Sequence, residues 1–451
     1  MPGKETHVTW ARSERFVPRA FIRPFMRFSN REASSGLVLV AAAAIAVVWA
    51  NLWPELYESL LSTTLRLDFG PLHLEEDIHH LINDGLMAVF FFVVGLEIKR
   101  ELVVGELRDR RAAALPVIAA LGGMAAPALV YLAIAGASGE PGRGWGIPMA
   151  TDIAFAIGIL SLVGKKVPVG AKLFLLTLAI ADDIGAILVI AVFYTAELSM
   201  GWLALAGGGL AAVVLAQRVG IRSSTLYAPL AILVWFATLE SGVHATLAGV
   251  ALGLLTPARP YYDYDEFRAK GRELMTGLTP EDDDVDEREL ADHTLLTISE
   301  ISRESVSPLA RIEHRLGNWS SFVVIPLFAL ANAGVNFQGS SVGEALLSPV
   351  GLGVALGLVV GKIVGITGFT LAAVRLKAGR LPEGVTVRHV FGVATVAGIG
   401  FTVSLFIANL AFTDPDLIED AKVGIFAASI VAALLGWLIL RAGPNAKGDS
   451  R

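Results

Sequence analysis

Two neighbouring aspartates, Asp182 and Asp183, lie inside the apolar segment LAIADDIGAILVI at residues 178–190. Continued through AVFYT, this segment is long enough to cross a lipid bilayer. A carboxylate at the bilayer centre costs about 2.5–3.5 kcal/mol on insertion scales, so such residues are rare and mark ion or proton pathways. Neighbouring side chains on a helix point about 100° apart. The two aspartates therefore cannot both face one partner, and we expect them to have different roles.

Two other apolar segments also contain a charged residue. Asp152 lies in PMATDIAFAIGIL, and Lys362 lies in GLVVGKIVGITGF. A buried lysine opposite one carboxylate offsets its charge and leaves the others free for a ligand. Carboxylate, hydroxyl and carbonyl oxygens suit a hard cation such as Na⁺ or Li⁺, and a carboxyl group removed from water also holds a proton more tightly. One site could thus hold either a metal ion or protons, which is the chemistry of exchange.

The alternative is that these charges form ion pairs that only hold helices together. A single Asp–Lys pair is compatible with that role. However, one amine cannot neutralise the three carboxylates of Asp152, Asp182 and Asp183. We therefore favour a transport site over a structural one.

The composition places these charges in a membrane protein. Of the 451 residues, 54% are hydrophobic and 17% charged, whereas soluble domains have about 25% charged residues. The absence of cysteine excludes disulfides and thiolate metal sites. The first 30 residues lack the apolar core of a cleavable signal peptide. Because there is also no GxxxxGK(S/T) phosphate loop, we expect neither ATP hydrolysis nor another enzymatic activity, and neither a cofactor nor a nucleic-acid partner.

Apolar stretches follow one another along most of the chain, and they predict an all-α polytopic membrane protein with about twelve transmembrane helices. Basic residues are concentrated in every second connecting segment, beginning with the N-terminal one. By the positive-inside rule, this alternation predicts that both termini lie in the cytoplasm and that the chain is a multi-pass protein of the plasma membrane. The expected spans lie near 34–53, 80–98, 112–136, 147–163, 172–196, 201–217, 225–239, 243–256, 318–336, 350–374, 389–412 and 421–440.

This pattern divides the chain into a basic cytoplasmic tail at 1–33, a transmembrane domain at 34–441 and a cytoplasmic tail at 442–451. Within the domain, the acidic loop 257–317 contains TPEDDDVDERELADH. Asp282, Asp284 and Asp286 have the early spacing of a calcium loop, but Glu287 stands where the turn needs glycine and His293 where the bidentate glutamate belongs. We therefore expect a solvated, poorly ordered insertion.

Two spans contain sequence that disfavours a continuous helix. GWGIP precedes Asp152, and VAGIGF interrupts the span at 389–412. Non-helical backbone at membrane depth is tolerated only where protein or a cavity surrounds it, and discontinuous helices in two parts of a transporter point to the binding site. Glycines also recur every four residues around Lys362, which predicts close contact with a neighbouring helix: Gly353, Gly357, Gly361 and Gly365.

Several motifs together resemble the NhaA-type sodium/proton antiporters. They are INDGLMAVFFFVVGLEIKREL, ATDIAFA, LAIADDIGAI, SGVHATLAG, FALANAGV, LPEG and GIGFTVSLFIA. The resemblance runs from about Ser34 to Arg441, apart from much of the 258–307 insertion. It departs from the family at Ile363, where some relatives have proline, in its longer N-terminus and in the insertion, which puts the usual pH response in doubt.

The resemblance implies an architecture and a set of site residues. This family is itself a standard example of inverted-repeat transporters, so the helices near 112–196 and 350–440 would be inverted repeats. Their broken helices, around 151–152 and 398–400, would cross at mid-membrane. By the same resemblance, Asp183 is the primary Na⁺ ligand with Asp152 and Thr151 beside it, and Asp182 is the partner of Lys362.

A second group of charges lies at the cytoplasmic end of the second span. Glu97, Arg100 and Glu101 are spaced for local contacts along one helix at the membrane interface. The resemblance instead implies that they form a cytoplasmic funnel that takes part in pH activation, together with Glu313 and His314. The residues leave both alternatives open.

Other polar residues are weaker candidates. His244 lies in an apolar span, where a lone histidine is usually a hydrogen-bonded packing residue. Asp84 is either a titrating group that faces an aqueous path or a helix-end charge. His79 and His80 are expected at the outer surface.

We therefore expect a secondary transporter that exports Na⁺ or Li⁺ in exchange for protons, electrogenic and regulated by pH, with the surrounding lipid as its other partner. The resemblance implies a homodimer. A passive cation channel is the alternative, because its pore would also use acidic residues. A symporter for sugars or amino acids is weaker still, because few hydrogen-bonding side chains flank the acids.

Overall fold

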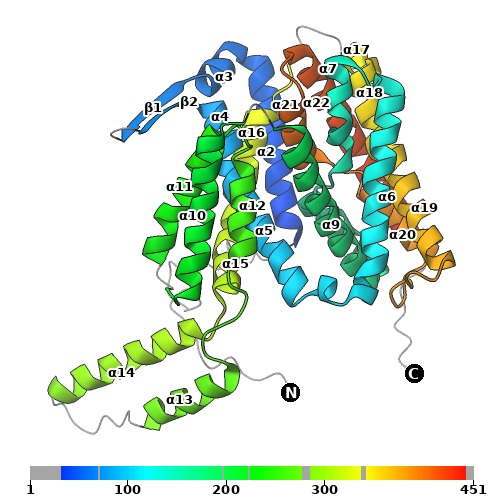
Figure 1. Ribbon diagram of the computed structural model, residues 1–451. Coiled ribbons are helices and arrows are strands. Elements are labelled where there is room, and N and C mark those ends of the chain that lie inside the picture. The colour runs from blue at the N-terminus through cyan, green and yellow to red at the C-terminus, as the bar shows by residue number, and fades with distance from the viewer. Residues whose placement is uncertain are drawn as a thin grey trace.

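The computed structural model describes residues 32–69, 72–195, 198–221, 224–276, 285–336 and 342–442, and most of these residues are helical. Several helices are uninterrupted and cross most of the molecule in Figure 1. The predicted all-α membrane fold is confirmed. The uninterrupted helices of the bundle are α2 (Glu32–Leu52), α6 (Arg110–Ala135), α9 (Val169–Phe193), α10 (Met200–Arg218), α11 (Ser224–Glu240), α12 (Thr246–Leu255) and α22 (Pro415–Arg441).

Three further spans each contain one wide π-helical turn, a feature frequent at functional sites. One runs through α4 (Ile78–His80), η3 (Leu81–Leu86) and α5 (Met87–Val103). The second runs through α15 (Pro308–Trp319), η7 (Ser320–Val324) and α16 (Ile325–Asn332). The third runs through α18 (Pro349–Leu356), η8 (Gly357–Gly361) and α19 (Lys362–Arg375).

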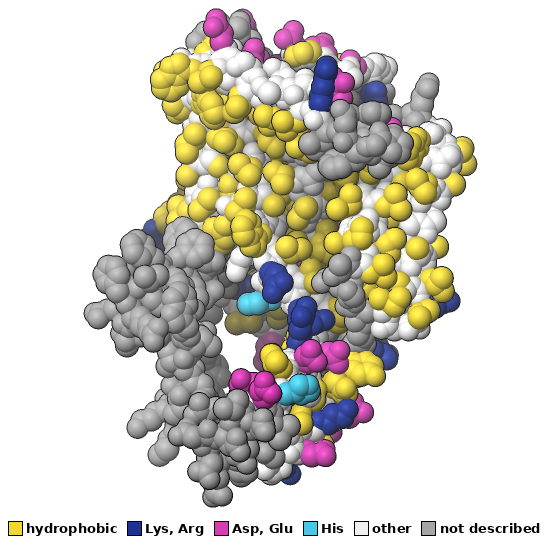
Figure 2. Space-filling view, turned by 90° about the vertical axis from the view of Figure 1, so that its left-hand side faces the viewer, with side chains coloured by type: hydrophobic (Ala, Val, Ile, Leu, Met, Phe, Trp, Pro, Cys, Tyr) yellow, Lys and Arg dark blue, Asp and Glu magenta, His cyan; other side chains and the backbone are white. Residues whose placement is uncertain are grey.

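Seven helices of the described chain are long and apolar enough to cross a membrane, and two bent pairs raise that number to nine. Helices α11 and α12 are shorter apolar helices. Together with the α15–α16 span, they account for the expected number of about twelve. Figure 2 shows a broad band of hydrophobic side chains, with mostly Asp and Glu side chains and a few Lys or Arg side chains above it, and charges of both signs below it.

The two bent pairs occupy matching places in the chain. Between α6 and α9, α7 (Gly139–Gly142) and η5 (Arg143–Met149) meet α8 (Ile153–Val163) at 42°. Between α19 and α22, α20 (Val387–Val396) meets α21 (Phe401–Ala411) at 49°. Each unit is therefore a long helix, a bent pair and another long helix. Both breaks lie where the sequence predicts discontinuous helices.

The first long helices of the two units run antiparallel and in close contact. A methyl group added to Gly365 would meet the carbonyl oxygen of Gly122, and one added to Gly353 would meet the ring of Tyr131. The N-terminal part of α6 therefore packs against α19 and its C-terminal part against α18, so the two helices run in opposite directions. An inverted repeat requires this arrangement. The close contact predicted from the glycine spacing is confirmed.

Two short strands form a hairpin that the sequence does not predict. Strand β1 (Thr64–Phe69) pairs antiparallel with β2 (Leu72–Asp77), with Thr64 opposite Asp77. On its exposed surface Arg66 forms an ion pair with Glu75 at 2.6 Å. The hairpin follows α3 (Pro54–Leu61) and extends outward from the bundle in Figure 1. Its acidic composition is typical of a loop, which is why the strands were not expected.

The acidic insertion, which the sequence predicts to be solvated and poorly ordered, contains two helices. These are α13 (Tyr264–Thr276) and α14 (Val285–Glu304), which extend away from the bundle in Figure 1. Both are rich in Glu and Arg, and α14 also contains several Leu residues; these residue types favour helices even without a packed core. Helix α13 buries none of its residues. Asp282 and Asp284 of the rejected calcium loop lie outside the described residues, as do most of the two predicted terminal tails.

Candidate functional site

The breaks in the two bent pairs contact each other inside the bundle. The backbone N–H of Asp152 donates to the carbonyl of Ile399 at 2.7 Å, and the Thr151 hydroxyl lies 2.9 Å from the carbonyl of Ala397. The Ser404 hydroxyl donates to the carbonyl of Ile147 at 2.7 Å. A helix break leaves polar backbone groups that must find partners away from water. Here each break supplies partners for the other.

Asp152 is placed at the N-termini of two helices. It is the N-cap of α8, where its carboxylate accepts the N–H of Phe155 at 3.1 Å. Its other oxygen accepts the N–H of Thr402 at 3.1 Å and the Thr402 hydroxyl at 2.7 Å, at the first turn of α21. Helix N-termini carry partial positive charge and unpaired N–H groups. The anion at Asp152 is therefore stabilised by both helices of the crossing.

Lys362 is a cation placed near a helix C-terminus, whereas Asp152 is an anion at helix N-termini. Its ammonium donates to Asp182 Oδ2 at 2.5 Å, to the Met149 carbonyl at 2.5 Å and to the Thr151 hydroxyl at 3.0 Å. An ammonium has three donors, so all of them are used. Met149 ends η5, and the C-terminal end of a helix favours a cation. Both members of the Lys362–Asp182 pair are fully enclosed.

Asp183 differs from both of these carboxylates. It is buried, with 6% of its surface exposed. Within the described residues its carboxylate accepts no hydrogen bond, whereas Asp152 and Asp182 are both held by protein donors. Asp182, Asp152 and Glu97 all lie within electrostatic range of Asp183. An unpaired buried carboxylate next to other acids is costly unless a proton or a cation joins it.

The charges at the crossing do not balance. Three buried carboxylates face one buried lysine, so the site has room for positive charge. The ligand oxygens of the three acids do not all lie within 4.8 Å of one another in the described structure. A cation at Asp183 would therefore take only part of its coordination from these carboxylates, and the rest from carbonyl, hydroxyl or water oxygens.

The charges at the end of α5 also meet a distant helix. Arg100 forms an ion pair with Glu313 on α15 and lies 3.5 Å from Glu101. Glu97, one turn earlier on α5, is within electrostatic range of all three. The structure thus brings together four of the five residues expected in the pH response. His314 is exposed and forms no hydrogen bond or ion pair in the described part of the chain.

Glu313 lies on the first part of α15, before the apolar segment that the sequence predicts near 318–336. Burial raises the pKa of its carboxyl group, and the neighbouring Arg100 guanidinium opposes that rise. The ion pair is therefore sensitive to acidification. Glu101 is held on its other side, where it accepts the backbone N–H of Glu106 at 3.0 Å.

A second buried polar group, which we call the amide cluster, consists of His79, Asn83, Asn332 and Asn409. Asn332 is completely buried. Its nitrogen donates to Asn83 Oδ1 at 2.9 Å and to the Phe328 carbonyl at 2.9 Å. Its oxygen accepts from Asn409 at 2.5 Å and from His79 Nε2 at 3.1 Å. All four hydrogen-bonding positions of the Asn332 amide are used.

The weaker candidates also have defined partners. His244 Nε2 lies 2.6 Å from the carbonyl of Tyr194, which matches the packing role expected for it. The backbone carbonyl of Asp84 accepts the indole N–H of Trp235 at 2.9 Å. The sequence predicts that His79 lies at the outer surface. In the structure it is part of the amide cluster.

Sequence reasoning missed several contributors to the crossing and to the amide cluster. Thr402 stands immediately after the break in GIGFTVSLF, where a hydroxyl can reach a helix-end charge, and this position was the available signal. Asn332 is a lone amide in the apolar run FALANAGV. The carbonyls of Met149 and Ala397 are backbone groups, so no residue type marks them in a sequence.

Comparison with known proteins gives a consistent family. Residues 26–440 match the family described as Na⁺/H⁺ antiporter 1. The chain is 48% identical over 436 residues to the Na(+)/H(+) antiporter NhaA of Syntrophobacter fumaroxidans, which covers 94% of this chain and 92% of that protein. It is 45% identical over 432 residues to the Na(+)/H(+) antiporter NhaA of Koribacter versatilis, with 95% and 94% covered. A similar relative from Acidithiobacillus ferrooxidans is 46% identical over 435 residues, with 95% and 99% covered.

Proposed function

This chain belongs to the NhaA-type Na⁺/H⁺ antiporter family, and we propose that it exports Na⁺ or Li⁺ while protons enter the cytoplasm, in an electrogenic and pH-regulated cycle. Sodium and proton antiport by a multi-pass membrane protein follows from the family. The direction, the use of Li⁺, the charge movement and the residues that carry out exchange are our proposals.

The observation that carries the proposal is the unpaired carboxylate of Asp183. At the same crossing, Asp152 is held by three donors and Asp182 by Lys362 and Thr151. Asp183 is the acid that remains available for an ion. We assign it as the primary ligand of Na⁺, with Asp152 as the second carboxylate of the site.

For Thr151 we propose a role other than the direct binding of Na⁺ that the resemblance implies. Its hydroxyl accepts from Lys362 and lies 2.9 Å from both Asp182 Oδ2 and the Ala397 carbonyl. It would bind Na⁺ only after giving up some of these bonds. We propose that Thr151 couples ion binding at Asp152 to the Lys362–Asp182 pair.

Exchange follows from competition at the aspartates. A carboxylate binds either a proton or part of the shell of a cation, so Na⁺ from the cytoplasm displaces protons and protons from outside displace Na⁺. If Asp183 and Asp152 both release protons as one Na⁺ binds, each cycle moves net charge. This is our reason for proposing an electrogenic exchanger.

We place the pH response at the group formed by Glu97, Arg100, Glu101 and Glu313. These charges connect α5 with α15, and α5 also packs against α9, which carries Asp183. Protonation of Glu313 would remove the ion pair between α5 and α15. His314, which forms no hydrogen bond or ion pair in the described structure, is the least supported member of the group.

We further propose that the protein lies in the cell inner membrane with both termini in the cytoplasm. The alternation of basic loops supports that orientation. The three predicted regions, 1–33, 34–441 and 442–451, would then be a tail, a transporter domain and a second tail. A homodimer is proposed on the family resemblance alone.

The rival functions are less well supported. A passive channel would need an open path lined by acidic groups, whereas the acids here are buried at a crossing and one is neutralised by lysine. The named relatives are antiporters and do not favour a channel.

Everted membrane vesicles test the proposal. A proton gradient is established and reported by a pH-sensitive dye, and NaCl or LiCl is then added across a series of pH values. An exchanger dissipates the proton gradient on addition of either salt and accumulates Na⁺ against its gradient. Sodium flux that only follows its own gradient would contradict exchange.

A further inference from the structure

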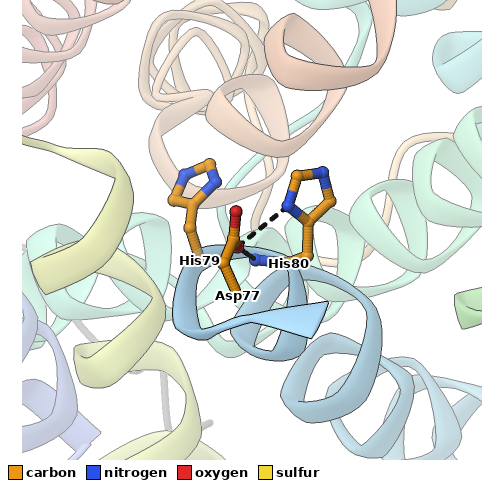
Figure 3. A group of neighbouring side chains, drawn as sticks. All are labelled: Asp77, His79 and His80. Carbon is orange, nitrogen blue, oxygen red and sulfur yellow. Dashed lines mark hydrogen bonds and ion pairs between the residues drawn. The ribbon is translucent and has the colours of Figure 1, made fainter. Parts of the chain in front are cut away.

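Three metal-binding side chains lie together where the hairpin joins the α4–α5 span. Asp77, His79 and His80 each offer one ligand atom, and these atoms lie within 4.8 Å of one another. Figure 3 shows the three side chains on the same turn, with the Asp77 carboxylate between the two imidazole rings. His80 Nδ1 lies 2.9 Å from Asp77 Oδ1. The antiport mechanism uses none of these three side chains.

The amide cluster fixes the chemical form of His79. Because the Asn332 nitrogen already donates twice, its oxygen must be the acceptor of the bond from His79 Nε2. His79 Nε2 therefore carries the proton, and Nδ1 of the neutral ring has a lone pair. The Asn83 side-chain nitrogen approaches Nδ1 at 3.4 Å, and a metal ion would have to replace this contact. Histidines that bind metals usually donate their other N–H to a protein oxygen, which orients the ring. His79 has such an oxygen in Asn332.

The surroundings allow an ion to enter. The His80 side chain is 61% exposed and that of Asp77 is 29% exposed. Glu76 and Asp84 add negative charge near His80, while Lys422 lies nearer to His79. Two imidazoles and one carboxylate with an open fourth position are a ligand set that suits Zn²⁺ and related borderline metals, and does not suit Na⁺.

We propose that Asp77, His79 and His80 form a binding site for Zn²⁺ or a similar transition-metal ion at the outer face, and that occupation of this site slows exchange. The second part rests on the proposed function. A ligand that prefers one conformation shifts the protein toward it. In the structure described here, His79 joins the metal site to the amide cluster, which connects η3 with α16 and α21. A bound metal would fix the His79 ring and, through its bond to Asn332, would favour this arrangement of the three elements.

The site is tested first by direct binding, which does not depend on transport. Purified protein in detergent is titrated with ZnCl₂ by calorimetry, and with CoCl₂ while the visible absorption of the cobalt is recorded. We compare the unaltered chain, His80→Ala and Asp77→Asn with His293→Ala, a matched control on the exposed helix α14. Loss of one ligand should weaken binding by at least about tenfold, while the control should bind unchanged. Equal binding by the unaltered chain and His80→Ala would overturn the site.

The effect on exchange is then measured in proteoliposomes of known orientation, with ZnCl₂ added to one side at a time. Zinc at the face that carries the hairpin should slow Na⁺/H⁺ exchange, and a chelator should restore it. His80→Ala should exchange normally without zinc and lose the inhibition. Binding without inhibition would overturn the regulatory part alone. Inhibition only from the opposite face would contradict this location. Absence of exchange without zinc would instead count against the proposed function.

Discussion

The crossing of the bent helices and the amide cluster are both buried polar groups, but their hydrogen bonds are arranged very differently. In the amide cluster, Asn332 uses all four of its positions on protein partners. At the crossing, Lys362 is bonded to Asp182 and the Met149 carbonyl, and Asp152 is bonded to Thr402. Asp183, in contrast, accepts no hydrogen bond within the described residues. Both regions connect α21 to other helices, and only one has an unsatisfied charge.

This difference separates a structural group from a transport site. A buried network in which every group has a partner fixes the position of its helices. A buried carboxylate without a partner is unfavourable until an ion or a proton arrives. The crossing thus contains a carboxylate without a partner, whereas every polar group of Asn332 in the amide cluster has one. Substitutions in the first should alter transport, and those in the second should mainly alter stability.

The largest effect is expected at Asp183. Asp183→Asn keeps the shape of the side chain but removes the negative charge that would bind Na⁺ and the group that would exchange a proton. Exchange in everted vesicles should fall to the level of membranes without the protein, while the purified variant should remain folded and inserted. Asp265→Asn on the exposed helix α13 is the matched control. Substantial exchange by Asp183→Asn would remove the distinction between the two regions.

The next effect concerns the lysine pair. Lys362→Ala leaves Asp182 buried without its partner, and breaking such a pair typically costs about 3–5 kcal/mol. The melting temperature and the exchange rate should both fall. The double variant Asp182→Asn with Lys362→Gln should recover stability more fully than electrogenic transport, as measured by thermal unfolding and by the membrane potential. If the double variant is no more stable than Lys362→Ala, the pair does not have this energetic role.

A smaller and opposite pattern is expected for the amide cluster. Asn332→Leu leaves the polar groups of Asn83, Asn409 and His79 without their shared partner, and each unsatisfied buried group costs about 1–3 kcal/mol. Thermal stability should fall, while Na⁺ affinity measured by calorimetry should stay close to that of the unaltered chain. A double-mutant cycle with Asn409→Ala measures the coupling. Loss of Na⁺ binding with unchanged stability would show that we have assigned the two regions the wrong way round.

The smallest effect is a change in pH profile. The pKa of Glu313 is raised by burial, so this residue takes up its proton at a higher pH than an exposed glutamate. Below that pKa the residue is already neutral, and Glu313→Gln should change little. At pH values above the Glu313 pKa, the variant lacks the ion pair with Arg100 that the unaltered chain has. Its exchange rate should therefore differ from that of the unaltered chain only above this pKa. Glu300→Gln is the exposed control, and equal shifts in both variants would exclude a specific role.

Much of the fold was predictable from the sequence, because apolar length and broken-helix motifs each have a direct physical cause. The four intramembrane charges were also found from the sequence, since a charge in an apolar span is conspicuous. The hairpin was not found, because its residues resemble an acidic loop. Thr402, Asn332 and the carbonyls of Met149 and Ala397 were missed because their importance depends on three-dimensional contacts between segments 213 to 250 residues apart.

The central claim is that Na⁺ and protons compete for the aspartates at the crossing. It is tested most directly by calorimetric Na⁺ binding between about pH 6 and about pH 8.5, in two buffers of different ionisation enthalpy. In the range where the site is protonated, apparent Na⁺ affinity should weaken by at least about tenfold for each unit of falling pH, with protons released to the buffer. Binding that is independent of pH and releases no protons would contradict the shared site, even if the protein still exchanged sodium.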